Sequence, residues 1–173
     1  MCSGRYIGRQ VATREKYSEA LADWVLAHGL AGASLRPMAK AAGTSDRMLV
    51  YHFGGKAGVL RAALDVIAAR NMDSLDAALP EQAMPAETLM PLIGAAMSGE
   101  LFRPSLAVFF ELAAMSLRGD ADARAVGHRI ASHFHAWLAA RLTEPERAGE
   151  LLGAIEGWGV LTAVGLDLPF PSG

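Results

Sequence analysis

The sequence is poor in the features that define several large classes of protein. It contains a single cysteine, Cys2, which excludes an internal disulfide and a zinc site built from cysteines. No uncharged apolar run approaches the ~18 residues that a membrane span needs, and the nearest candidate, residues 157–166, is far too short. The first ten residues lack the apolar core of a signal peptide. We therefore expect a cytoplasmic protein without a membrane partner.

Signatures of catalysis are also missing. The sequence has no glycine-rich phosphate loop, no GxSxG nucleophile elbow and no cysteine–histidine nucleophile pair. His128, His133 and His135 do not have the i, i+4 spacing that is typical of metal sites on helices. The sequence thus predicts neither an enzyme nor a bound metal or cofactor.

The composition that remains favours an all-α fold. Alanine, leucine and methionine dominate, whereas β-branched residues are sparse. The net charge of -2 hides an asymmetry, because Lys and Arg outnumber acids nine to four through Ala62, whereas acids outnumber Lys and Arg fourteen to seven beyond it. A basic front end suggests a polyanionic partner, although chance variation in surface charge produces the same pattern.

Residues 34–56 contain two short helical patterns joined by a turn of small residues, which is the arrangement of a helix-turn-helix. Ser34 is placed to cap the first helix, and Gly43 permits the sharp turn because glycine reaches positive φ at low cost. Ser45 is a good cap for the second helix, residues 46–53. That helix has three apolar residues that can face the core: Leu49, Val50 and Phe53. In such a motif the second helix enters the DNA major groove.

The flanking segments are predicted to be helical as well. Residues 13–28 form a first helix with Thr13 as its cap, whereas residues 1–12 show no periodicity and are expected to be a flexible arm. Lys56 begins a long helix to about Asp76. Beyond a loop bounded by two prolines, further helical patterns cover residues 86–99, 101–105, 106–117, 122–142 and 145–165. We therefore expect a three-helix domain in residues 13–55, joined by the long helix to a second helical domain in residues 56–173.

Specific residues of the front segment also form a recognisable pattern. A first helix ends in Gly, a second carries Ala and then Ala-Gly, and a third ends in an aromatic-His-Phe stretch followed by Lys: Gly29, Ala39, Ala42-Gly43, Leu49-Val50-Tyr51-His52-Phe53 and Lys56. With this spacing, residues 13–62 resemble the DNA-binding domain of the TetR-type transcriptional regulators. The sequence departs from the family at Val50 and Leu35, where a tyrosine and a threonine often contact the DNA backbone, and at Ala57, where an acid is common.

The resemblance makes a set of residues candidates for contact with DNA: Arg36, Lys40, Ser45, Asp46, Arg47, Met48, Tyr51, His52 and Lys56. Arg47 is favoured for a base, because a guanidinium can donate two hydrogen bonds to guanine O6 and N7. Lys56 lies at a helix N-terminus, where its charge and the helix both favour a phosphate. Other roles stay open: Arg47 can pair with Asp46 or face solvent, His52 can bond a backbone carbonyl, and Asp46 can serve the dipole of its own helix.

The resemblance also implies a second domain that binds a ligand and forms a dimer. The candidate pocket residues are mostly methionine and phenylalanine, which suit an apolar ligand: Met90, Met97, Phe102, Phe109, Phe110, Glu111, Met115 and Phe134. Glu111 can hold a cationic or hydroxylated ligand, pair with an arginine such as Arg103, or face water. The candidate dimer residues lie on the apolar stripes of the last two helices: Val126, Ile130, Trp137, Leu151, Ile155 and Trp158. Both groups can instead pack inside the monomer.

Together these features predict a sequence-specific regulator of transcription. We expect a homodimeric repressor that binds a palindromic operator in double-stranded DNA and leaves it when a small apolar molecule binds. One alternative is a helical small-molecule-binding or enzymatic protein without specific DNA binding. Another is a protein that coats DNA without sequence preference, for which affinity would be equal on all sequences and would fall steeply with salt.

Overall fold

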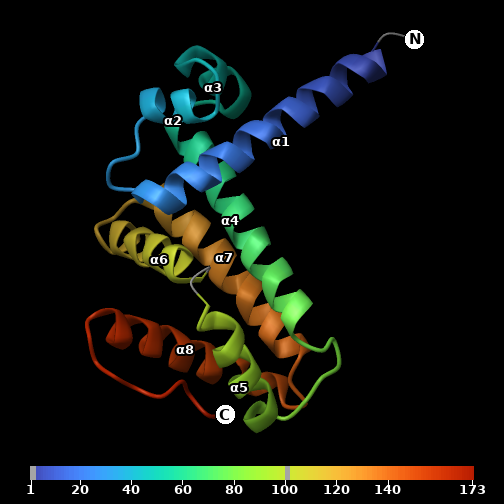
Figure 1. Ribbon diagram of the computed structural model, residues 1–173, viewed down its shortest axis with the longest axis vertical. Helices are drawn as coiled ribbons and strands as arrows, with labels where there is room; N and C mark the ends of the chain where they lie inside the picture. The colour runs from blue at the N-terminus through green and yellow to red at the C-terminus, as the bar shows by residue number, and fades with distance from the viewer. Residues whose placement is uncertain (1–2, 100–101) are drawn as a thin grey trace. The chain divides into compact units, whose positions relative to one another are not determined.

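The computed structural model describes residues 3–99 and 102–173, and these ranges contain helices and no strand. The predicted all-α fold is confirmed for this part of the chain. The helices shown in Figure 1 are α1 (Ser3–His28), α2 (Leu35–Ala41), α3 (Asp46–Phe53), α4 (Lys56–Ala78), α5 (Ala86–Met97), α6 (Phe102–Leu117), α7 (Ala121–Ala140) and α8 (Ala148–Ala163), with a short 3₁₀ helix η1 (Pro145–Arg147) before α8. None of these helices is long and apolar enough to cross a bilayer.

The chain divides into two compact units within helix α4. The N-terminal unit extends through Ala69, and the C-terminal unit comprises residues 70–173. Each unit is described separately below. Two residues singled out in the sequence, Cys2 and Leu101, lie outside the described residues.

Helix α1 begins ten residues earlier than its predicted cap. The backbone is helical from Ser3, whereas the sequence showed no helical periodicity over residues 1–12 and predicted a flexible arm there. The segment contains no proline, and a helix already formed beyond Thr13 extends at the cost of only one residue at a time. Gly29 ends α1 as expected, with φ of 73°. Near the end of α1 the Trp24 ring stacks on His28, with 4.5 Å between ring centroids.

The turn between α2 and α3 follows the chemistry predicted for it. Gly43 has φ of 65°, which is the left-handed conformation that glycine adopts without steric cost. The Ser45 hydroxyl accepts a hydrogen bond from the Met48 backbone N–H, so it caps α3. Ser34 occupies the N-cap position of α2 but makes no capping hydrogen bond through its side chain. Helix α3 ends at Gly54, whose φ is 80°.

A small apolar core holds the helices of the N-terminal unit together. Its fully buried side chains include Leu21, Val25, Met38, Leu49 and Val59, with Phe53 almost fully buried. The Arg14 guanidinium lies 5.4 Å from the centre of the Phe53 ring, an additional contact between α1 and α3. Leu49 and Phe53 therefore fix one side of α3 inside the unit. Val50, which was expected to face the core, is instead exposed.

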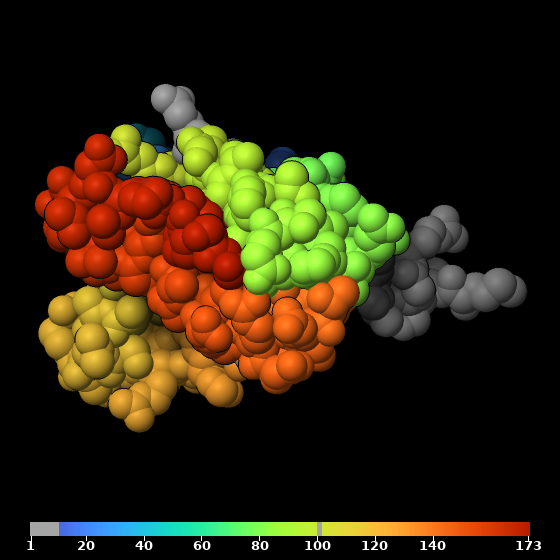
Figure 2. Space-filling view, turned by 90° about the horizontal axis from the view of Figure 1, so that it is seen from below, coloured from blue at the N-terminus to red at the C-terminus, as the bar shows by residue number. Residues whose placement is uncertain are grey.

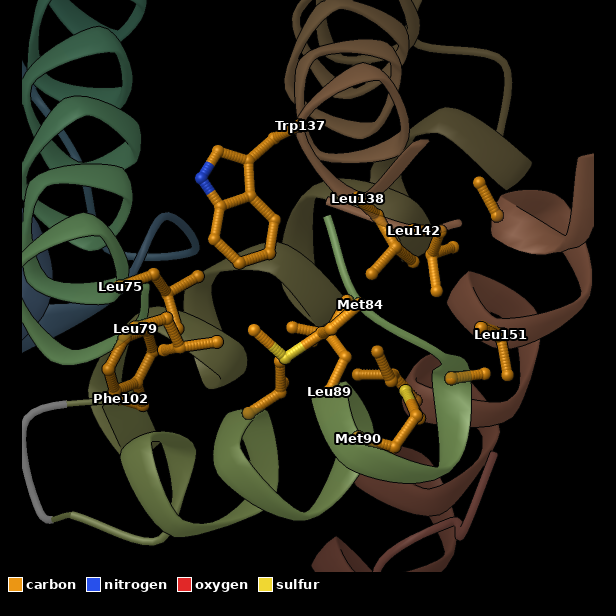
Figure 3. Close-up of a cluster of buried hydrophobic side chains, with 14 residues drawn as sticks. Leu75, Leu79, Met84, Leu89, Met90, Phe102, Trp137, Leu138, Leu142 and Leu151 are labelled. Atoms are coloured by element: carbon orange, nitrogen blue, oxygen red, sulfur yellow. The ribbon is translucent and has the colours of Figure 1, made fainter. Parts of the chain in front are cut away.

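The C-terminal unit has its own core, built from the second half of α4, α5, the start of α6, α7, α8 and the loops that follow α4 and α7. Figure 3 shows Leu75, Met84, Leu89, Trp137, Leu142 and Leu151 converging from these segments. A short backbone bridge joins the loop after α4 to the end of α7, because Met84 N–H donates to the Arg141 carbonyl and Thr143 N–H donates to the Met84 carbonyl. The last helical segment, predicted over residues 145–165, begins with η1, and α8 starts at Ala148.

Polar contacts connect the end of α4 to α7 in the same unit. The Trp137 indole N–H donates to Asp76 Oδ1 at 2.7 Å. The Arg141 guanidinium also pairs with Asp76 and lies over the Trp137 ring, 4.3 Å from its centre. Earlier on α4, Asn71 Oδ1 accepts a hydrogen bond from the Ser105 hydroxyl at 3.1 Å. Ser105 belongs to α6, which is continuous from Phe102 rather than divided after Ser105 as the sequence predicted.

The last nine residues fold back over α8 and α5. Gly165 turns the chain with φ of 94°, and the Trp158 indole N–H then donates to the Leu168 carbonyl at 3.1 Å. Phe170 packs edge-on against Trp158 and covers Gly94 of α5. In Figure 2 the dark red end of the chain lies against the green α5. This segment closes one side of the C-terminal core.

Candidate nucleic-acid interface and effector region

One side of helix α3 carries exposed side chains suited to DNA. Asp46, Arg47, Met48 and Tyr51 are all exposed, and the Tyr51 side chain is the most open of the large apolar or aromatic residues on α3, at 64%. The opposite side of the helix is fixed by buried Leu49 and Phe53. The N-terminal unit therefore presents a short, capped helix whose outward residues include the arginine predicted to read a base.

The remaining basic candidates for contact with DNA lie on α2 and at the start of α4. Lys56 is the first residue of α4 and is exposed. Arg36 and Lys40 are exposed on α2. Two backbone N–H groups at a helix start can join a lysine in binding a phosphate oxygen. The described part of the N-terminal unit thus places positive side chains on α2, on α3 and at the start of α4.

His52 and Asp46 have local contacts that bear on their alternative roles. The half-buried His52 ring packs edge-on against Tyr17 and Tyr51, with centroids 5.4 and 5.1 Å away. Asp46 occupies the first turn of α3, where a carboxylate interacts favourably with the helix dipole. These contacts favour a supporting role for both residues, with His52 holding Tyr51 in place.

The residues predicted to line a ligand pocket fall into two groups. Met90 and Phe102 are buried in the core of the C-terminal unit, and Met97 and Phe134 pack against that core. Phe109, Phe110, Glu111 and Met115 are half-buried along α6. The second group keeps the partial exposure that a ligand contact requires, whereas the first contributes to the packing of the monomer.

The residues predicted for the dimer interface are mostly occupied within the chain. Val126, Trp137, Leu151 and Ile155 are buried in the C-terminal unit, while Ile130 and Trp158 are half-buried. A different side of α8 is open, since Val160, Leu161 and Val164 are exposed. Space is also open above Gly153 and Gly157, which share this side of the helix. We call these five residues the outer face of α8.

Sequence reasoning did not single out Glu156, which lies within α8. Its Oε2 atom is buried and has no hydrogen-bond partner in the described structure. Burial raises the pKa of the Glu156 carboxyl to about 6, because an apolar environment disfavours the charged form. The sequence contains one pattern that could have pointed to Glu156, because it is the only charged residue between Leu151 and Leu166.

Comparisons with known proteins identify the fold. No protein-family model and no curated protein matches the sequence. Among solved structures, a Rhodococcus sp. protein assigned to the TetR family of transcriptional regulators superposes with a TM-score of 0.72 at 19% identity, over 90% of this chain and 89% of that one. The transcriptional regulator SCO7518 from Streptomyces coelicolor A3(2) gives 0.73 at 24% identity, with the same coverage.

A third similar structure carries a bound ligand. The multidrug binding protein EbrR, complexed with proflavin, superposes with a TM-score of 0.68 at 27% identity, over 92% of this chain and 93% of that one. The resemblance to TetR-type regulators is therefore confirmed at the level of the fold, and it extends well beyond residues 13–62 to most of the chain.

Proposed function

We propose that the protein is a sequence-specific DNA-binding regulator of transcription. The observation that carries the proposal is α3, a helix capped by Ser45 and fixed by buried Leu49 and Phe53, with Arg47 and Tyr51 exposed on its outer side. A helix held in this way can enter a major groove without losing its own packing. The fold shared with transcriptional regulators supports the same assignment.

The exposed residues divide into groups that position the protein and groups that read sequence. Arg47 is assigned to a guanine, because its fork of N–H donors matches O6 and N7. Tyr51 is assigned to a thymine methyl group or a phosphate. Lys56, Lys40 and Arg36 are assigned mainly to phosphates, which set the register of the unit on the duplex. Val50 and Leu35 replace the tyrosine and threonine that often contact the DNA backbone in TetR-type regulators. The contacts of Arg36, Lys40, Arg47, Tyr51 and Lys56 therefore supply more of the affinity.

We assign the homodimer interface to the outer face of α8. Its apolar side chains include Val164, which is 77% exposed and has no evident function in the isolated chain. Gly153 and Gly157 allow another helix to approach closely, since open space lies above them. Two copies related by a two-fold axis would bring two α3 helices to the half-sites of a palindromic operator.

The C-terminal unit is assigned to the binding of a small-molecule effector. EbrR, which shares this fold, binds proflavin, and half-buried aromatic residues along α6 supply comparable apolar contacts here. Because α4 belongs to both units, a ligand that prefers one position of its second half changes the population of DNA-binding dimers. We propose that the ligand favours the state with low operator affinity, so that the protein acts as a repressor.

Selection of preferred DNA sites from a random duplex pool tests the proposal directly. We expect a palindromic site to be enriched, and we expect the selected duplex to bind far more tightly than a shuffled duplex at the same salt concentration. Equal binding of both duplexes, with an affinity that depends only on salt, would assign the protein to non-specific DNA coating instead. Absence of any complex would favour a helical ligand-binding protein.

A further inference from the structure

Helix α3 exposes an apolar surface beside its basic residues. Met48 is 38% exposed and Tyr51 is 64% exposed. Among the described residues, Met48 is the only exposed methionine. Met48 and Tyr51 are three positions apart, so their side chains lie next to each other on one side of the helix. They therefore form one adjoining apolar surface, which differs from the single exposed apolar residues that are common on proteins.

Local contacts hold this surface in place. The Met48 backbone N–H donates to the Ser45 hydroxyl at 3.3 Å, which fixes Met48 in the capped first turn of α3. Leu49, the next residue, is fully buried. The His52 ring packs edge-on against Tyr51, with 5.1 Å between ring centroids. Because the backbone is already ordered, a partner that contacts Met48 loses little free energy to reordering the helix.

The charge near this surface indicates what it binds. Arg47 precedes Met48 on α3, and exposed Arg36 and Lys40 lie on α2 of the same unit. Exposed Lys56 begins α4. Positive side chains beside an apolar surface suit a partner with phosphates at its edges and an apolar group between them. The major groove of DNA has this arrangement, because the C5-methyl group of thymine projects into it between the two phosphate backbones.

Val50 is also apolar and exposed on α3, at 42%, but it differs from Met48 in two ways. It is two positions farther along, which turns it by about 200° around the helix axis, away from Met48. Its side chain is short and stiff, whereas the long thioether of Met48 can reach and adapt to a base edge. Residues near the N-terminus of a recognition helix are those that contact base edges. These differences favour Met48 and make Val50 a suitable control.

We propose that Met48 recognises the C5-methyl group of a thymine in the major groove, with the Tyr51 ring as the adjoining apolar contact. The inference rests on the proposed function, since it assigns a specificity-determining residue of the same DNA site. Each half-site of the operator then contains at least one T·A pair that the protein distinguishes by its methyl group. This contact adds to the hydrogen bonds assigned to Arg47, which cannot detect a methyl group.

Replacement of thymine by uracil in the selected operator, one position at a time in one half-site, tests this assignment. Uracil differs from thymine only in lacking the C5-methyl group. At the position that Met48 contacts, we expect uracil to weaken binding of the wild type about fourfold, which is the loss for one buried methyl group. 5-Bromouracil should restore the affinity there, because bromine has about the size of a methyl group. Fluorescence anisotropy measures each affinity.

Variants of the protein connect this loss to one side chain. Met48→Ala, which keeps a good helix former in α3, should bind the thymine and uracil duplexes within about 1.5-fold of each other. Met48→Leu retains an apolar side chain of similar volume and should keep most of the difference. The matched control Val50→Ala should keep the full difference of about fourfold.

Three results overturn the inference: half-sites without a T·A pair, a wild type that binds every uracil duplex as tightly as the thymine operator, or a Met48→Ala protein that distinguishes the two duplexes as the wild type does. Each of these leaves a selected operator, so the proposed function stands. Failure of the proposed function gives a different result, because the selection then enriches no site, which overturns the regulator and the methyl contact together.

Discussion

Arg47 is the residue to which the proposed interface assigns the most sequence information. It lies exposed in the first turn of α3, next to the capped N-terminus. We expect Arg47→Ala to weaken binding to the selected operator by about 1–3 kcal/mol and to relax preference at one base pair of each half-site. Fluorescence anisotropy on the operator and on single-base variants of it measures both effects.

The control for this substitution is Arg124→Ala, which removes an exposed arginine from α7 in the C-terminal unit. It should leave both affinity and base preference close to the wild type. An Arg47→Ala protein that binds as tightly and as selectively as the wild type would remove the base contact from the proposal.

Glu156 also predicts how stability depends on pH. Its folded pKa of about 6 lies above the ordinary value of 4.5, so the folded state binds the proton more tightly than the unfolded state does. The cost of burying the charge is absent below pH 4.5 and complete above about pH 6, where it amounts to about 2 kcal/mol. Glu156→Gln should therefore stabilise the protein more at pH 7.5 than at pH 4.5.

Chemical denaturation of both proteins at the two pH values measures this difference. Glu150→Gln, on the exposed side of α8, should show little change in its effect between them. A Glu156→Gln effect that is the same at both pH values would mean that this carboxyl titrates normally.

At this scale, the residues predictable from sequence are those whose role is local. Ser45 caps α3 and Gly43 turns the chain because both act on neighbouring backbone. Met90 and Phe109 could not be told apart, since both are apolar residues on helices and only tertiary packing buries one and leaves the other half-exposed. Glu156 was missed for the same reason, because only the folded structure shows that its Oε2 atom is buried.

At the scale of elements, the approach of α3 to α4 depends on Gly58. A Cβ at this position would lie 1.8 Å from the backbone oxygen of Phe53, which cannot rotate away. We expect Gly58→Ala to destabilise the N-terminal unit by about 1–3 kcal/mol, as overpacking does. The loss should appear although alanine favours a helix over glycine by about 1 kcal/mol. Thermal unfolding followed by circular dichroism measures it.

Gly32→Ala is the matched control in the same unit. Gly32 has open space above it and no positive φ, so the substitution should change stability by less than about 1 kcal/mol. If Gly58→Ala proved as stable as this control, the close approach of α4 to Phe53 would not hold in solution.

The presence of each helix was easier to predict from the sequence than its first and last residues. Periodicity identified the segments that became α3, α4 and α7, because their apolar residues recur at helical spacing. It failed at the start of α1 and across Ser105 in α6, where the helix continues without a strong apolar stripe or a cap. In both places helix propagation decides the limit, and propagation leaves no local signal in the sequence.

At the scale of the whole molecule, the proposed dimer depends on the outer face of α8. Leu161→Arg places a charge in the middle of this face, where a helix of the second copy would have to bury it. We expect the variant to be monomeric at concentrations where the wild type is dimeric, as measured by sedimentation velocity. Operator affinity should fall with it, because one unit alone contacts only one half-site.

Leu117→Arg serves as the control, since Leu117 is 89% exposed at the end of α6 and lies outside this face. It should leave the oligomeric state unchanged. A Leu161→Arg protein that sediments as the wild type does would move the interface to another surface of the C-terminal unit.

The three tryptophans give each region its own optical reporter. Trp24 stacks on His28 in the N-terminal unit, Trp137 donates to Asp76, and Trp158 lies under the returning chain end at Phe170. Emission from a variant that keeps only Trp24 should report the unfolding of the N-terminal unit, because unfolding separates the Trp24 ring from His28. A variant that keeps only Trp158 should report detachment of the final segment. Spectroscopy of such single-tryptophan proteins can thus resolve whether the two units melt together or in sequence.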